Sequence, residues 1–167
     1  MKRITAMILV LACCLGLCGC GQNGGIKDSA SFYYQRSDLL SDSESGAISA
    51  EKRDITGHTE DLSYLISLYL MGPLDGSLQS PFPDSYRLEE VTLTDSELVI
   101  HLSGSGNDLR PSQFSLACGC LAMTCLELTQ AESVTITCGN LSQTLTPGSL
   151  TLYDNVIGKE PTNGGTK

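Results

Sequence analysis

Tryptophan is absent from the 167-residue sequence, and aromatic residues make up only 5% of it. Because a sugar-stacking platform is built from exposed aromatic rings, this composition argues against one. Positive charge is also scarce, with 10 Lys and Arg against 19 Asp and Glu, which gives a formal net charge of −9. Such a surface repels nucleic acid and anionic lipid, and no basic cluster reverses that. The composition therefore excludes nucleic acid as a partner class.

Recognisable catalytic motifs are missing as well. The sequence has no G-x-S-x-G, no H-E-x-x-H and no P-loop. Gly104-Ser105-Gly106-Asn107 is glycine-rich, but it lacks the lysine and the third spaced glycine of a phosphate cradle, so a plain loop is the better interpretation. These absences predict that the chain is not an enzyme and needs no cofactor, with an uncharacterised hydrolase as the weakest alternative.

Few residues remain as candidates for acid–base or metal chemistry. His58 is predicted to be a loop residue before a helix, and His101 to lie on the solvent side of a strand. Glu89 and Glu90 are adjacent on a strand, so they point to opposite faces and cannot act as a pair across one bond. An acidic loop could bind Ca²⁺ weakly, but it lacks EF-hand spacing, and a solvated loop is the simpler interpretation; its acids are Asp38, Asp42 and Glu44.

The longest apolar run, residues 4–17, is too short for a dependable membrane span. It follows Lys2 and Arg3 and precedes a Leu17-Cys18-Gly19-Cys20 sequence, the layout of a secretory signal. Leu-x-Gly-Cys resembles the lipobox of bacterial lipoproteins. That resemblance implies cleavage before Cys20 and attachment there of a diacylglyceryl group with palmitate-type acyl chains. Cys18 as a competing site, or an ordinary signal peptide with incidental cysteines, are the alternatives.

Cleavage there would leave Cys20 as the first residue of an acidic mature chain. The removed residues include two basic and no acidic side chains, so the formal charge becomes −11. Acyl chains contribute roughly 0.8 kcal/mol per buried CH₂ and would hold the protein on the membrane. Residues 20–30 then form a flexible, glycine-rich linker.

Four cysteines lie beyond Cys20, in a compartment where disulfides form. Their spacing matches no recognised zinc arrangement. Cys118 and Cys125 are two helical turns apart, roughly 10 Å along the axis, which is too far for a bridge between them. We interpret these two as small buried hydrophobes. A disulfide of Cys138 with one of Cys118, Cys120 and Cys125 remains an alternative.

Hydrophobic periodicity predicts two helices and a set of short strands. The first helix, residues 60–71, carries Leu62, Leu65, Ile66 and Tyr69 on one stripe, with Thr59 as its cap and Gly72 as a left-handed stop before a proline. The second helix, residues 112–129, is apolar on more than one side, which predicts a central place in the core or contact with a partner. Strands are predicted at residues 31–35, 47–55, 87–93, 97–102, 133–137 and 141–146, with a loop at 74–85. Ile48 and Ala50 are expected on one face of the strand at 47–55, and Leu98, Ile100 and Leu102 on one face of the strand at 97–102.

In order and spacing, these pieces resemble the GerMN domain, a sporulation and spore-germination module of bacterial lipoproteins. The resemblance covers residues 31–157 and rests on an aromatic first strand, a Gly-Pro helix stop, a proline loop, a hairpin ending in serine and a Thr-bearing helix. The corresponding sequences are Phe32-Tyr33-Tyr34, Leu70-Met71-Gly72-Pro73, Pro81-x-Pro83, Leu102-Ser103, Thr124-Cys125 and Val134-Thr135-Ile136 before Cys138-Gly139. Cys125 stands where the family usually has leucine.

The resemblance implies an α+β fold similar to ring-building motifs. The expected domain is single and compact, with two helices packed on one small, mostly antiparallel sheet. Residues 1–19 are then the signal peptide and 158–167 a disordered tail, and residues 151–157 pack back on the domain. The implied function is a lipid-anchored, extracytoplasmic, non-enzymatic interaction or scaffold module of the cell envelope. Its partner would be an envelope or sporulation protein or a further copy, and the alternative is a peptidoglycan-binding or small-ligand-binding lipoprotein.

Overall fold

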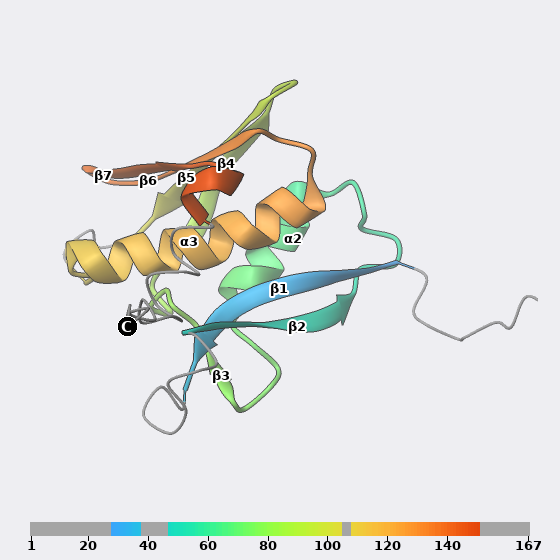
Figure 1. Cartoon of the computed structure of the whole chain (residues 1–167), viewed down its shortest axis with the longest axis horizontal. Helices are drawn as coiled ribbons and strands as arrows, with labels where there is room; N and C mark the ends of the chain where they lie inside the picture. The colour runs from blue at the N-terminus through green and yellow to red at the C-terminus, as the bar shows by residue number, and fades with distance from the viewer. Residues whose placement is uncertain (1–27, 38–46, 105–107, 151–167) are drawn as a thin grey trace, which may run out of the picture.

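The computed structural model describes residues 28–37, 47–104 and 108–150, and these form three layers (Figure 1). A layer of two helices lies between two β-sheets. The predicted signal peptide, most of the linker, the acidic loop, the segment 151–157 and the tail lie outside the described residues. The elements, in chain order, are β1 (Ser29–Arg36), β2 (Ile48–Asp54), α2 (Leu62–Leu70), β3 (Leu78–Gln79), β4 (Arg87–Leu93), β5 (Glu97–Ser103), α3 (Pro111–Leu128), β6 (Ser133–Cys138) and β7 (Leu141–Leu145).

The α+β class is confirmed, but the strands form two sheets instead of the single sheet predicted. The first sheet has the order β2-β1-β3 and is antiparallel throughout. Its short third strand, β3, lies in the segment 74–85 that was predicted to be a loop. It pairs over two positions only, Gln35 with Gln79 and Arg36 with Leu78, and a strand of that length has no periodicity to detect.

The second sheet has the order β4-β5-β6-β7. β4 and β5 form an antiparallel hairpin, and so do β6 and β7. The central strands β5 and β6 run parallel, because α3 connects them as a crossover. Inward-facing residues alternate along β5 as predicted, with Leu98, Ile100 and Leu102 buried.

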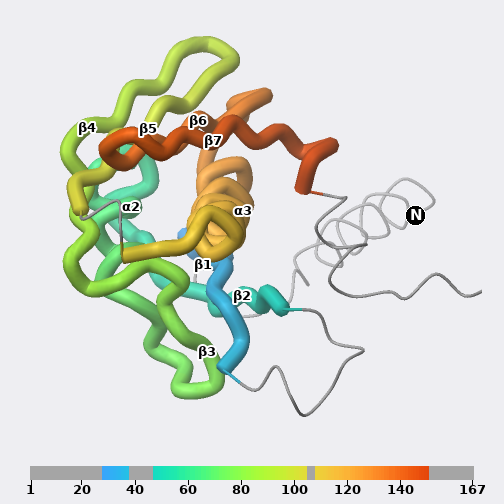
Figure 2. The backbone as a smooth tube through the Cα atoms, turned by 90° about the vertical axis from the view of Figure 1, so that its left-hand side faces the viewer, coloured from blue at the N-terminus to red at the C-terminus, as the bar shows by residue number. Residues whose placement is uncertain are grey.

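The two-sided apolar character of α3 is explained by its position between the sheets, which Figure 2 shows nearly end-on. Cys118 and Cys120 lie on different sides of the helix and both are fully buried. Toward the first sheet, Thr124 accepts a hydrogen bond from the backbone N–H of Tyr33 at 2.9 Å. The central position in the core is therefore confirmed for this helix.

The first helix begins at a cap that differs from the predicted one. The carboxylate of Asp61, not the hydroxyl of Thr59, accepts a hydrogen bond from the backbone N–H of Tyr64 at 2.9 Å. With Asp61 as the cap, α2 begins at Leu62, two residues later than predicted. At α3, Pro111 occupies the first turn and the Gln113 side chain accepts from the backbone N–H of Arg110 at 3.0 Å.

Candidate interaction surface

The chain turns sharply after α2, at a corner formed by residues 71–75. Gly72 has φ +90°, the left-handed conformation that the sequence predicted. Its backbone N–H bonds to the carbonyl of Tyr69 at 3.0 Å, and Pro73 then prevents any continuation of the helix. A methyl group on Gly72 would only reach ordinary contact with Ser80, at 3.8 Å. The glycine is therefore required by backbone conformation and not by lack of space.

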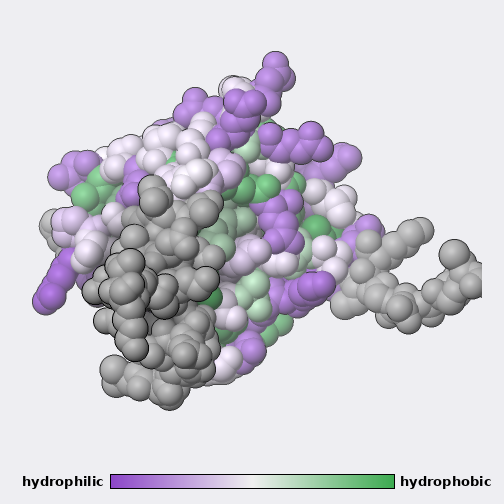
Figure 3. All heavy atoms as spheres, in the orientation of Figure 1, coloured by the Kyte–Doolittle hydropathy of each residue, from purple (hydrophilic) through white to green (hydrophobic). Residues whose placement is uncertain are grey.

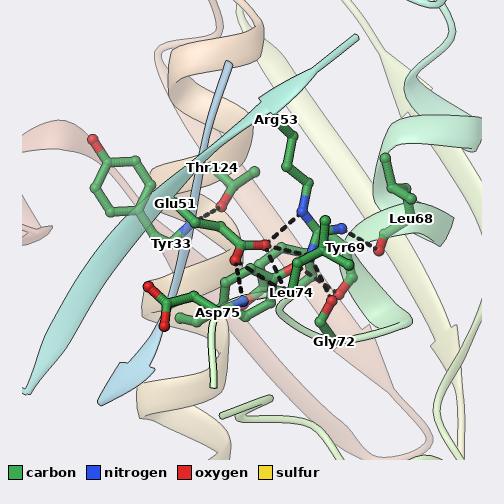
Figure 4. Close-up of polar contacts among 10 residues, drawn as sticks. Tyr33, Glu51, Arg53, Leu68, Tyr69, Gly72, Leu74, Asp75 and Thr124 are labelled. Atoms are coloured by element: carbon green, nitrogen blue, oxygen red, sulfur yellow. Dashed lines mark hydrogen bonds and ion pairs between the residues drawn. The ribbon is translucent and has the colours of Figure 1, made fainter. Parts of the chain in front are cut away.

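A buried arginine from β2 holds the end of α2 (Figure 4). The guanidinium of Arg53 donates to the carbonyl of Leu68 at 3.2 Å and to that of Gly72 at 2.6 Å. Arg53 is only 6% exposed. Carbonyls at a helix C-terminus lack partners within the helix and carry negative partial charge. Arg53 supplies both the donors and the complementary charge.

Glu51 pairs with Arg53, and we call the pair Glu51–Arg53 the clasp. Its carboxylate accepts from the Arg53 Nε at 2.6 Å and from the backbone N–H groups of Leu74 and Asp75 at 3.0 and 2.9 Å. Burial raises the pKa of Glu51, but the hydrogen bonds from Asp75, Leu74 and Arg53 outweigh it and lower that pKa below its ordinary value. The clasp is thus an ionised pair that pins both sides of the corner to β2.

Aromatic rings of the core support the clasp from beneath. The Arg53 guanidinium lies over the rings of Phe32 and Tyr34, at 5.1 and 5.5 Å from their centroids. Tyr34 stacks on Tyr69 at 4.7 Å, and its hydroxyl donates to the Tyr69 carbonyl at 3.1 Å. Within the described residues, the Tyr69 hydroxyl is the one buried side-chain oxygen without a hydrogen bond. The corner is therefore fixed to the first sheet by charge, hydrogen bonds and ring packing.

Two large apolar side chains project from this fixed corner. Met71 is 82% exposed and Leu74 is 85% exposed, the two highest values among the described large hydrophobic residues. On the face shown in Figure 3, hydrophobic residues occur in small groups among hydrophilic ones. Two highly exposed apolar side chains on a held backbone make this corner our candidate contact point for another protein.

The predicted cysteine interpretation agrees with the burial of the thiols. Cys118, Cys120, Cys125 and Cys138 are all buried and free. Burial raises the pKa of Cys120 and of Cys125 to about 12, which disfavours the thiolate form of both side chains. The Cys138 thiol donates weakly to the carbonyl of Gly104 at 3.8 Å. A bridge to Cys138 stays a prediction.

The remaining candidates lie apart from one another. The ring of His58 stacks on that of Tyr64 at 3.8 Å, before and on α2. His101 is half-buried on β5 and its Nδ1 shares a hydrogen bond with the hydroxyl of Thr137 at 2.6 Å. Glu89 and Glu90 are both exposed, beside a bulge in β4. Within the described ranges, no three His, Cys, Asp or Glu residues are grouped so that they could hold a metal ion.

Sequence reasoning missed the clasp. Residues 47–55 were predicted as a strand, but Ile48 and Ala50 were placed together as its apolar face, and Ala50 is exposed. The inward face carries Glu51 and Arg53 instead. The available signal was opposite charge at positions i and i+2 of one strand, which places both side chains on one face.

Comparisons with protein-family models, with curated proteins and with solved structures found no match. Among the described helices, none is long and apolar enough to cross a membrane.

Proposed function

We propose that this chain is a lipid-anchored, non-enzymatic interaction module on the extracytoplasmic face of a bacterial membrane. Its anchor is Cys20, on the strength of the Leu-x-Gly-Cys sequence and the preceding basic and apolar segments. The observation that carries the interaction role is the corner after α2. There, Met71 and Leu74 are exposed on a backbone that the Glu51–Arg53 clasp holds.

The physical reason is preorganisation. Binding costs free energy whenever loops and side chains must be ordered, so a backbone that is already fixed loses less on association. Exposed apolar side chains also gain more from burial by a partner than polar ones do. The corner combines both properties: a fixed backbone and two side chains that are more than four-fifths exposed.

The GerMN resemblance supports a role in the cell envelope, linked to sporulation or spore germination. Its Leu70-Met71-Gly72-Pro73 motif is the sequence of the corner itself. The partner in this proposal is an envelope or sporulation protein or a further copy of the chain.

The test is site-specific photocrosslinking in intact cells. A photoreactive residue at Met71 or Leu74 is expected to capture a defined protein, whereas the same residue at the exposed Thr144 of β7 captures none. The variant Met71→Ser/Leu74→Ser should lose the complex while keeping its thermal midpoint, and Cys20→Ala should release the chain from membranes.

Two results would overturn this proposal. One is the absence of any protein crosslinked at the corner. The other is retention of the wild-type chain on purified peptidoglycan that is unaffected by Met71→Ser/Leu74→Ser, which would instead support the wall-binding alternative.

A further inference from the structure

A further surface lies along α2 where the helix packs against the edge strand β4, and it shares Met71 with the corner. It has two separate hollows, and we treat the strip of α2 and β4 that carries them as one groove. The first, about 720 Å³, lies at the start of α2, and the second, about 450 Å³, lies at its end. The first is lined by residues 57–63 with Val91 and Leu93, and the second by Ser67, Leu70, Met71, Asp84 and Arg87. We call this surface the α2–β4 groove.

The α2–β4 groove has apolar walls and acidic ends. Leu62, Leu70 and Val91 are half-buried along it, and Leu93 is 47% exposed. Glu60 and Asp61 lie in the first hollow and Asp84 in the second. The distribution is therefore acid, apolar, acid along the length of the helix.

Among the residues that line the two hollows, Arg87 is the only Lys or Arg. Its guanidinium is engaged locally, since it donates to the carbonyls of Asp84 and, at 2.7 Å, of Tyr86. These bonds hold the guanidinium in place but leave its positive charge, so Glu60, Asp61 and Asp84 against Arg87 give the lining of the two hollows a net charge of −2.

We propose that the α2–β4 groove binds a short basic amphipathic helix of a partner protein, an inference that rests on the proposed interaction function. Lysine or arginine at each end of that helix would face Glu60 and Asp84, and apolar side chains between them would cover Leu70, Val91 and Leu93. The nine residues of α2 span about 13 Å at 1.5 Å per residue, so the partner helix needs two to three turns.

Charge and the features of strand β4 favour a basic helix as the occupant of the groove over a second copy of the chain or an added β-strand. A second copy of the chain would bring a second acidic surface against the first, and repulsion between the like charges would weaken binding. An added β-strand would have to pair with β4, whose exposed Arg87, Glu89 and Glu90 and its bulge are features that block edge pairing.

The experiment measures binding of two synthetic 11-residue helical peptides to the full acylated chain in zwitterionic nanodiscs, with empty nanodiscs as the blank. Both peptides carry the same leucine stripe; one has lysines at its ends and the other has glutamates. The lysine peptide is expected to bind at least tenfold more tightly, and its affinity should fall as salt is raised.

Matched variants locate the site. Glu60→Lys should weaken binding of the lysine peptide about fivefold, whereas Glu132→Lys, the same charge change at the exposed residue just before β6, should leave it within twofold. Leu93→Ser should weaken it about tenfold. All three variants should keep the wild-type thermal midpoint.

Equal binding of the two peptides, or equal effects of Glu60→Lys and Glu132→Lys, would overturn the basic-helix inference. Neither result touches the proposed function at the corner, where Leu74 lies outside the lining of both hollows and its crosslinks report on the corner alone. Conversely, if the lysine peptide binds as expected but no protein is crosslinked from Leu74, the corner is not the main contact and the groove proposal alone remains.

Discussion

Helices α2 and α3 differ in how many of their sides are buried. α3 lies between two sheets, and nine of its 18 residues are buried. α2 has three buried residues out of nine, and the side opposite them faces solvent. The difference separates two tasks: α3 joins the sheets into one core, and α2 presents the corner and the groove.

Side-chain size explains why α3 can serve both sheets. Its central turns carry Ala117, Gly119 and Ala122 among the cysteines, and all of these are small. Small residues let strands approach a helix closely on more than one side. α2 carries leucine, isoleucine and tyrosine on its buried face instead, which fill the space beneath one side only.

The largest expected effect comes from shortening a core side chain of α3. Leu121→Ala should lower the free energy of unfolding by about 3–5 kcal/mol, because Leu121 is fully buried and the walls on both sides are fixed by sheets. Leu70→Ala, on the half-buried side of α2, should cost about 1 kcal/mol. Chemical denaturation measures both, and equal losses would contradict the separation of tasks.

Breaking the clasp is expected to have the next largest effect. Arg53→Met should cost about 3 kcal/mol, because it leaves the buried carboxylate of Glu51 and the carbonyl of Gly72 without their partner. The neighbouring exposed Lys52→Met should cost under about 0.5 kcal/mol. If Arg53→Met unfolds at the wild-type denaturant concentration, α2 does not depend on β2 for its C-terminal end.

Thr124→Val tests the contact between α3 and the first sheet. The two side chains have nearly the same shape, but valine cannot accept the hydrogen bond from the Tyr33 N–H. The expected loss is about 1–2 kcal/mol. Thr129→Val serves as a control at the helix end, where the hydroxyl bonds only within its own segment. Similar small losses for both would mean that the α3–β1 bond contributes little.

A smaller effect is expected at the corner. Gly72→Ala should cost about 1 kcal/mol through the positive φ, since nothing blocks the added methyl group. Gly76→Ala, four residues on and without a positive φ, should be neutral or slightly stabilising. Thermal unfolding of both variants decides whether the corner conformation is required.

The smallest expected effect is on the pH dependence of stability. The folded-state pKa of Glu51 lies below its ordinary value of 4.5, so its contribution is complete above that value and is lost as the pH falls through the folded-state pKa. Glu51→Gln should therefore flatten the loss of stability in acid below about pH 4.5. Glu132→Gln should leave the dependence of stability on pH unchanged. If Glu51→Gln also leaves it unchanged, the clasp is not the source of the loss of stability in acid.

Local patterns predicted the elements of this fold better than their assembly. The stripe Leu65, Ile66 and Tyr69 and the alternation along residues 97–102 each lie within one element, so their burial follows from spacing alone. The separation of β1 and β2 into a second sheet depends on which surfaces meet across more than 50 residues. No single-strand pattern carries that information.

The candidate surface was predictable in part. Gly72-Pro73 predicted the corner, because glycine and proline determine the conformation of the backbone at their own positions. The clasp was not predicted, since it joins Arg53 to carbonyls 15 and 19 residues away. Every residue has a backbone carbonyl, so the sequence does not show which carbonyl will accept a hydrogen bond. Exposure of Met71 and Leu74 was equally hidden, because an apolar residue after a helix is as easily buried as exposed.

The position of α3 between the sheets also determines when the core against the first sheet is complete. Tyr33 meets Thr124 across 91 residues, so β1 lacks its contact with α3 until the chain is available that far, although the rings of Phe32 and Tyr34 also pack against Tyr69 of α2. Contacts so distant in sequence slow folding, since a long loop must close before they form. A chain truncated before residue 111 would keep the pairing of β1 with β2 but lose the α3 side of the core.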